Sequence, residues 1–348
     1  MPDPKIIVKF MPRGYQAGSF EQWIRQFPGN QPVWGNCRFV FDREARNYDW
    51  LVIYNDLPRP EPHSPDGELL ACPRGRTILL APEPSSVRTY GSAFLAQFGI
   101  VVTYQEPWAI SHPNLIFSHA GEYWFYGLSE THAVSYDELT RRGPSPKERL
   151  ISTVCSSKRQ RHTMHHDRYD FTQRLAAALP ELAVFGHGVR NMADKAEALD
   201  PYRYHVAIEN QTCPHYWSEK LADAFLAFTL PFYCGCPNVA DYFSPECLIP
   251  IDIADFDGSL ATIREAMATN QYEKRLPAII EARRRVLDEH NLFALLHRII
   301  RDHDPGPGGA GVGTRLYGQH TLWRHRPLAG LRGAIEKARV RLHLATGV

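Results

Sequence analysis

Residues His205–Phe243 read HVAIENQTCPHYWSEKLADAFLAFTLPFYCGCPNVADYF. The stretch predicts a buried strand, a polar loop, a helix that starts at Ser218, and a second buried strand that ends before Gly235. Its polar residues fall where the chain leaves the first strand or enters the helix: Glu209, Asn210, Tyr216, Glu219 and Lys220. Ligands bind at this edge of an open α/β sheet. The stretch therefore predicts an α/β fold and the place of a site.

Strand and helix patterns continue to alternate on both sides of this stretch. Downstream of residue 144, strand-like runs at Leu150–Cys155, Ala183–Phe185 and Leu248–Ile253 alternate with helical patterns, which is typical of a parallel, doubly wound sheet. The first half contains short apolar runs separated by polar, proline-rich connections, and these predict a second Rossmann-like sheet. The runs are Lys5–Phe10, Arg38–Asp42, Trp50–Asn55, Thr77–Ala81 and Ile100–Tyr104.

A chain of 348 residues is long enough for two domains. The proline-containing stretch Arg142–Lys147 is the best candidate for a linker, and the glycine-rich stretch Asp304–Gly313 for a second connector. We therefore expect an N-terminal domain at residues 1–144, a second domain at 145–301, and a connector with a basic tail at 302–348.

Composition limits the class of protein. A hydrophobic content of 44%, a charged content of 22% and a net charge of +1 are ordinary for a soluble globular chain and give no reason to expect a nucleic-acid partner. Seven cysteines without a CxxC pair favour reduced thiols over disulfides. The first residues lack the apolar core of a signal peptide. Together these features predict a cytoplasmic protein.

The start of the helix at Ser218 suits an anionic ligand. Ser218 is a favourable N-cap, and Glu219 and Lys220 would follow in the first turn. A helix N-terminus has free backbone N–H groups and a partial positive charge, which bind phosphate, and Lys220 would add a full charge. Glu219 could accept hydrogen bonds from sugar hydroxyls. Spacing alone slightly favours a solvated first turn without a ligand, and only the whole set of motifs shifts the balance.

The order of these motifs resembles the signature of glycosyltransferase family 10, the α-1,3/1,4-fucosyltransferases, in its bacterial type. That signature runs F-E-N-(S/T), then Y-x-T-E-K, then a V-P-(I/V)-Y-x-G strand. The corresponding segments here are Ile208–Gln211, Tyr216–Lys220 and Leu230–Gly235. The chain departs from the signature at Gln211, Ser218 and Cys234. The resemblance extends over roughly residues 150–256.

The resemblance implies a GT-B fold, in which two Rossmann-like domains face each other across a cleft. It implies an inverting, metal-independent transfer of fucose from GDP-fucose to a hydroxyl of an oligosaccharide or glycolipid acceptor. Two alternatives stay open: a GT-B transferase for another GDP-sugar, and a catalytically inactive homologue that binds a nucleotide or a glycan.

The resemblance also implies roles for particular residues. Glu83, in Thr77–Ser85, corresponds to the proposed catalytic base of the family. Arg168 corresponds to an arginine that grips the donor diphosphate, although Arg159 or Arg161 could take that role because the chain is longer here. The implied donor-binding set is Arg168, Glu209, Asn210, Tyr216, Ser218, Glu219 and Lys220.

Other motifs could in principle hold a metal. Two D-x-D patterns occur, at Asp255–Asp257 and Asp302–Asp304, and His162, His165 and His166 crowd one loop. Acidic residues commonly cap helices, and no HExxH pattern accompanies the histidines. We therefore expect no metal site and no obligatory cofactor.

The C-terminal tail predicts a basic amphipathic helix. Residues 315–348 contain seven Arg or Lys and one acidic residue. One helical stripe is apolar: Leu328, Leu331, Ile335, Ala338 and Leu342. Such a helix suits an anionic membrane surface, here through residues 324–344, and would give the protein a peripheral place on the inner membrane. A terminal helix packed back on the protein is the alternative.

Overall fold

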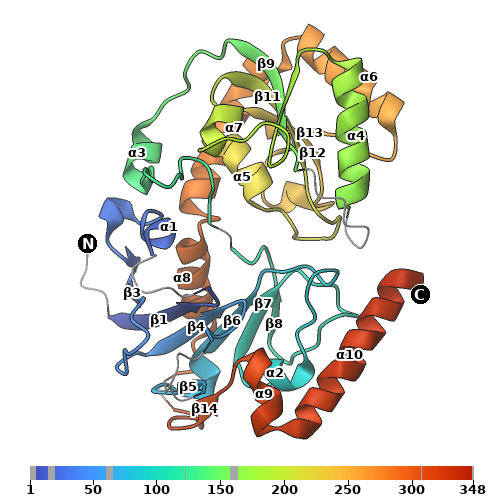
Figure 1. Ribbon diagram of the computed structural model, residues 1–348. Helices are drawn as coiled ribbons and strands as arrows, with labels where there is room; N and C mark the ends of the chain where they lie inside the picture. The colour runs from blue at the N-terminus through green and yellow to red at the C-terminus, as the bar shows by residue number, and fades with distance from the viewer. Residues whose placement is uncertain are drawn as a thin grey trace. The chain divides into compact units, whose positions relative to one another are not determined.

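The computed structural model describes residues 5–14, 20–59, 66–121, 123–156, 164–306 and 308–346. The chain forms two compact units, the first made of Met1–Gly121 with Leu292–Val348 and the second of Glu122–Asn291. Each unit has its own, mainly parallel sheet (Figure 1). The prediction of an α/β protein with two Rossmann-like domains is confirmed, whereas a cleft between them stays a prediction.

The sheet of the first unit has the order β2-β3-β1-β4-β6-β7-β8. Only β2 runs antiparallel to its neighbour. All residues of the interior strands β6 and β7 are buried. Their sequences are apolar apart from one threonine at an end of each strand, which is typical of strands that are covered on both faces. The strands are β1 Ile6–Pro12, β2 Val33–Trp34, β3 Cys37–Val40, β4 Trp50–Tyr54, β6 Thr77–Ala81, β7 Ile100–Thr103 and β8 Leu115–Phe117.

The helices between these strands are short, and the end of the chain returns to this unit. Two of these helices are α1 (Glu21–Ile24) and α2 (Ser92–Leu95). A small antiparallel sheet joins β5 to β14. The remaining elements of the unit are η1 Pro28–Asn30, β5 Glu68–Leu69, η2 Arg74–Arg76, α8 Leu292–His303, β14 Arg315–Leu316, α9 Gln319–His325 and α10 Pro327–Thr346.

The second unit has a five-stranded parallel sheet with the order β10-β9-β11-β12-β13. The chain runs from β9 to β10 on one side and then crosses to β11 on the other, so the topological switch point lies between β9 and β11. Its strands and helices are α3 Tyr136–Arg141, β9 Arg149–Val154, α4 His165–Ala178, β10 Leu182–Phe185, η3 Lys195–Ala198, β11 Tyr202–Ile208, α5 Glu219–Leu226, β12 Leu230–Cys234, η4 Val239–Asp241, η5 Pro245–Cys247, β13 Ile249–Pro250, α6 Phe256–Ala268 and α7 Gln271–Asp288.

The boundaries of the compact units differ from the predicted domain limits at 144 and 301. Residues 292–301 belong to the first unit because Phe293 of α8 packs among its aromatic residues, stacked on Phe27 with ring centroids 3.9 Å apart. The predicted linker Arg142–Lys147 lies inside the second unit. There the buried Lys147 ammonium donates to Leu199 O at 3.1 Å and to Thr229 Oγ1 at 3.0 Å.

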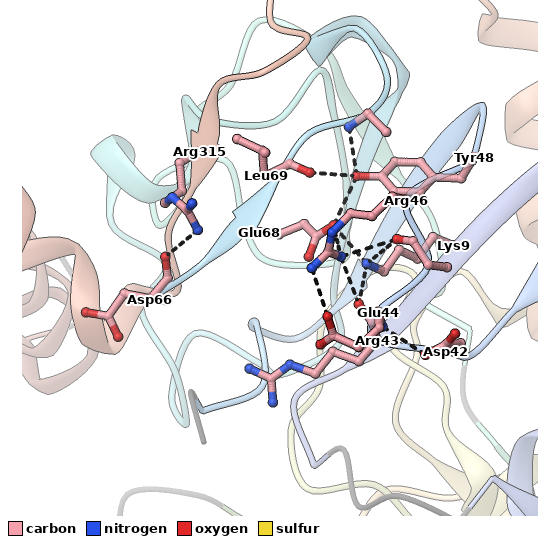
Figure 2. A network of polar contacts seen from close by, with 12 residues as sticks. Lys9, Asp42, Arg43, Glu44, Arg46, Tyr48, Asp66, Glu68, Leu69 and Arg315 are labelled. Atoms are coloured by element: carbon pink, nitrogen blue, oxygen red, sulfur yellow. Dashed lines mark hydrogen bonds and ion pairs between the residues drawn. The ribbon is translucent and has the colours of Figure 1, made fainter. Parts of the chain in front are cut away.

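A buried ion pair joins the first strand of the sheet to the β5–β14 pair. Figure 2 shows Lys9 of β1 and Glu68 of β5 at the centre of a polar network. The Lys9 Nζ, which is fully buried, donates to Glu68 Oε1 at 2.8 Å, Arg43 O at 2.6 Å and Ala45 O at 3.0 Å. Tyr48 OH donates to the same Glu68 oxygen at 3.2 Å. Burial lowers the pKa of Lys9, and Glu68 opposes that shift.

Replacing Lys9 should destabilise the first unit. Lys9→Met would remove the nearer of two cations beside the buried Glu68 carboxylate, because Arg46 Nη1 stays 3.6 Å from Glu68 Oε1. Loss of one partner of a buried pair costs up to about 3–5 kcal/mol. We expect a lower urea midpoint by tryptophan fluorescence. The matched control is Lys5→Met, because Lys5 is exposed at the start of the same strand. Equal midpoints for the two variants would contradict a stabilising role for the ion pair.

Candidate functional site

Glu209 joins the end of β11 to the start of α5. Its side chain is fully buried, and it accepts hydrogen bonds from Ser218 N at 2.9 Å and Ser218 Oγ at 2.6 Å. The Lys220 Nζ forms an ion pair with Glu209 Oε2 at 3.6 Å, the oxygen that also accepts from Ser218 Oγ. Burial raises the pKa of Glu209, and Lys220 opposes this shift. The loop between strand and helix is therefore closed by one carboxylate.

The N-terminus of α5 has the predicted cap. Ser218 has an extended backbone, and its hydroxyl accepts from Lys220 N at 3.3 Å. The Lys220 Nζ contacts Glu219 Oε1 at 3.0 Å. Burial alone would raise the pKa of Glu219, but the Lys220 and Lys195 ammonium groups outweigh it and lower this pKa to about 2. Burial alone would lower the pKa of Lys220, but Glu219 and Glu209 raise it above its ordinary value.

Arg168 lies at the other side of the β11 end. It belongs to α4 and is largely buried, and its Nη1 donates to Asn210 Oδ1 at 2.9 Å and to Ile208 O at 3.3 Å. The Arg168 guanidinium also repels the Lys220 ammonium, and this repulsion partly offsets the rise in the Lys220 pKa that Glu219 and Glu209 cause. The structure therefore places Arg168 in the cluster around Lys220, and its role in binding the donor stays a prediction. The alternatives Arg159 and Arg161 lie outside the described residues.

A cavity of about 360 Å³ opens beside these groups, and all its lining residues belong to the second unit. Arg168, Glu219 and Lys220 line it, whereas Glu209, Asn210, Tyr216 and Ser218 do not. Glu209 and Ser218 instead contact Lys220: the Glu209 carboxylate pairs with its ammonium group, and the Ser218 hydroxyl accepts from its backbone N–H. The apolar part of the wall includes Phe125, Leu128, Val154, Met192, Val206, Ala207 and Ile208. The cavity thus combines cationic and apolar surfaces.

Two residues that the sequence analysis did not single out line the same cavity, Lys195 and His205. The Lys195 Nζ donates to Asp223 Oδ2 at 2.7 Å and to Glu219 O at 3.3 Å. His205 Nδ1 lies 2.9 Å from Ser152 Oγ. Burial, together with Lys195 and Lys147, lowers the pKa of His205 to about 3, so the imidazole is neutral. The local sequence signal near these two residues is the capping box Asp194-x-x-Glu197, which indicates the start of a helical turn at Lys195 and does not indicate a ligand site.

Glu83 belongs to the first unit and lies two residues after the end of β6. Its side chain is half-buried, and Asn55 Nδ2 donates to Glu83 Oε1 at 3.4 Å. Its backbone oxygen accepts from Gln105 Nε2 at 2.7 Å, and Tyr104 OH donates to Pro82 O. The carboxylate therefore belongs to a loop that is held by Tyr104 and Gln105, the two residues that follow β7.

The D-x-D patterns have structural roles. Asp255 caps α6 by accepting from Gly258 N at 3.0 Å. Asp302 pairs with Arg301 at 2.7 Å, and Asp304 pairs with Arg76 at 2.9 Å.

The described part of the histidine run shows two ion-pair contacts, of which the longer joins His166 Nδ1 to Asp167 Oδ1 at 3.8 Å. His166 Nδ1 lies 3.1 Å from Asp170. His162 and the side chain of His165 lie outside the described residues. Within the described ranges no group of three or more His, Cys, Asp or Glu could hold a metal ion. The absence of a metal site stays a prediction.

Comparison with known proteins identifies the family of the second unit. Residues 144–273 match the model described as glycosyltransferase family 10 (fucosyltransferase) C-term. The chain carries a glycosyltransferase family 10 domain. The match covers β9 to the start of α7, and so includes the α5 N-terminus and most of the cavity wall. The family prediction is confirmed.

A curated relative and several solved structures are similar to this chain. The α-(1,3)-fucosyltransferase FucT of Helicobacter pylori is 33% identical over 75 residues, which span 21% of this chain and 16% of that protein. A crystal structure of an α1,3-fucosyltransferase with GDP-fucose has a TM-score of 0.47 at 16% identity, covering 79% of this chain and 82% of that one. WaaG, a glycosyltransferase involved in lipopolysaccharide biosynthesis, has a TM-score of 0.39 at 12% identity, covering 86% of this chain and 100% of that one.

Proposed function

We propose that this family 10 protein is an inverting fucosyltransferase that moves fucose from GDP-fucose to a hydroxyl of an oligosaccharide or glycolipid acceptor. The observation that carries the proposal is the coincidence of the family 10 domain with a cavity lined by Arg168, Lys195 and Lys220. The solved relative that holds GDP-fucose is the reason for naming this donor. The linkage formed would be α-1,3, as in the named relatives.

In this proposal the cavity binds the donor diphosphate. Lys220 and Lys195 are held at the wall by Glu219 and Asp223, so their positions are fixed before a ligand enters. The backbone N–H groups at the start of α5 add partial positive charge. Fixed cations stabilise the negative charge that develops on the leaving diphosphate, which is the electrostatic part of catalysis. Glu219, whose low pKa keeps it ionised, would accept hydrogen bonds from donor hydroxyls.

Lys220→Ala should weaken nucleotide binding. Loss of one charged hydrogen bond corresponds to about 1.5–3 kcal/mol. Titration calorimetry with GDP measures this loss directly. Lys274→Ala serves as the control, because Lys274 is exposed on α7 of the same unit. An unchanged GDP affinity in Lys220→Ala would remove Lys220 from the donor site.

Glu83 is proposed as the general base. An inverting transfer needs a carboxylate that takes the proton of the acceptor hydroxyl while the hydroxyl oxygen attacks the anomeric carbon and the diphosphate leaves. The Pro82 and Pro84 neighbours and the backbone bond from Gln105 hold Glu83 in place.

Glu83→Gln keeps the shape of the side chain and removes the base. We expect turnover of GDP-fucose to fall by a factor of about 10² or more, since general-base catalysis contributes that much. GDP affinity should stay unchanged in the same variant. Substantial turnover in Glu83→Gln would contradict this role. A donor other than GDP-fucose, or binding without turnover in the wild type, would favour the two alternatives named above.

The C-terminal helix is proposed to lie on an anionic membrane surface. Leu328, Leu331, Ile335 and Leu342 of α10 are 84%, 63%, 62% and 65% exposed. A different face of the helix packs on the first unit: Val340 is buried, Glu336 accepts from Ser92 Oγ at 2.5 Å and His343 lies on Trp108. One helix can therefore pack on the first unit through one face and present an apolar stripe to a membrane through another. Among the described residues no helix is long and apolar enough to span a membrane.

The membrane role is tested by co-sedimentation with anionic vesicles. Leu331→Glu with Ile335→Glu changes only the exposed stripe, and we expect it to abolish most of the binding, as should truncation before Arg324. Vesicles of neutral lipid are the control, because the basic residues should favour anionic lipid. Equal binding of wild type and both variants would contradict the proposal.

A further inference from the structure

Asn55 contacts the candidate base and has an unusual backbone. It follows β4, and β4 lies beside β6, which leads to Glu83. Its side chain is mostly buried, and its φ of 72° places it in the left-handed region. Residues other than glycine seldom adopt this conformation, with asparagine among the exceptions. Residues in such backbone conformations often lie at functional sites, so Asn55 is a candidate for a role beside the Glu83 carboxylate.

The orientation of the Asn55 amide is determined by its partners. Its Oδ1 accepts from Arg88 Nη1 at 2.7 Å and from Tyr90 OH at 2.8 Å. A guanidinium only donates, so the amide oxygen must face Arg88. The Nδ2 group then has to point the other way, where it donates to Glu83 Oε1 at 3.4 Å. The direction of the bond to Glu83 is therefore set by Arg88 and Tyr90.

Arg88 is in turn held by a segment far along the chain. Its Nη2 donates to Asp56 Oδ2 at 2.7 Å and to Gln319 Oε1 at 2.9 Å. Gln319, the first residue of α9, also donates from its backbone to Asp56 Oδ1 at 2.9 Å and from its side chain to Thr89 O at 2.8 Å. A continuous chain of hydrogen bonds thus runs from the C-terminal segment through Arg88 and Asn55 to Glu83.

We propose that Asn55 is a positioning residue for Glu83, and that Arg88 and Gln319 of the C-terminal segment hold Asn55 in this role. The inference rests on the proposed function, in which Glu83 takes the acceptor proton. An N–H donor on one carboxylate oxygen fixes the rotation of the carboxylate. The other oxygen stays available for the acceptor hydroxyl. A general base needs this fixed geometry, because small misplacements reduce the rate strongly.

Asn55→Gly and Asn55→Asp test the role without backbone strain, since both residues tolerate a left-handed backbone. Asn55→Gly removes the donor to Glu83, so we expect kcat to fall between about 10-fold and about 100-fold, with donor KM and GDP affinity unchanged. Asn55→Asp places a second carboxylate beside Glu83. A second negative charge nearby disfavours the ionised form of a carboxylate, so the acid limb of the kcat profile should move to higher pH.

Gln319→Ala extends the test to the C-terminal segment and keeps Asn55 in place. We expect a smaller fall in kcat than in Asn55→Gly, again without a change in GDP affinity. It also supplies a result if Asn55→Gly does not fold. The matched control is Asn30→Gly, because Asn30 is an exposed left-handed asparagine of the same unit with φ 53°. Its kinetics should equal those of the wild type.

The outcomes separate this inference from the proposed function. One outcome would overturn only the positioning role of Asn55. In that outcome Glu83→Gln is inactive, while both Asn55 variants keep the kcat and the pH profile of the wild type, so Glu83 remains the base. Substantial turnover in Glu83→Gln would overturn the base itself, and the inference with it. Loss of kcat in Asn55→Gly, a raised acid limb in Asn55→Asp and unchanged Asn30→Gly would support the full proposal.

Discussion

The buried bond between Glu209 and Ser218 is the constraint on which the candidate site depends. A carboxylate without solvent contact is costly unless it is fully bonded, and Glu209 obtains two hydrogen bonds from Ser218 and the charge of Lys220. These bonds fix the distance between the end of β11 and the start of α5. Lys220 and the first N–H groups of the helix therefore reach the cavity in a defined geometry.

The local parts of this site could be predicted from the sequence, and the distant parts could not. Ser218 and the first turn follow from a capping residue before an apolar helical pattern, which is a signal within a few residues. Lys195 and His205 reach the cavity only because η3 and β11 are brought together by the sheet. Likewise, the periodicity around α8 predicts a helix but does not say which sheet its Phe293 packs against.

The C-terminal segment of the chain supports the first unit at several places. Phe293 packs into its aromatic cluster, and β14 pairs with β5, whose Glu68 is bonded to Lys9. Gln319 holds Arg88 beside the Glu83 loop, and Glu336 of α10 caps the start of α2. Residues that follow the family 10 domain in sequence therefore shape the loop that carries the candidate base. The predicted domain limit at residue 301 therefore differs from the boundary of the compact units at residue 292, because sequence order alone does not show that the chain returns to the first unit.

The central claim is that the cavity beside Lys220 is a GDP-sugar site. Titration calorimetry of the wild-type protein with GDP, GDP-fucose and UDP tests it most directly, without an acceptor. We expect GDP and GDP-fucose to bind and UDP to bind at least about 10-fold more weakly, a difference of about 1.4 kcal/mol in binding free energy. Binding of UDP alone, or equal binding of GDP and UDP, would contradict it.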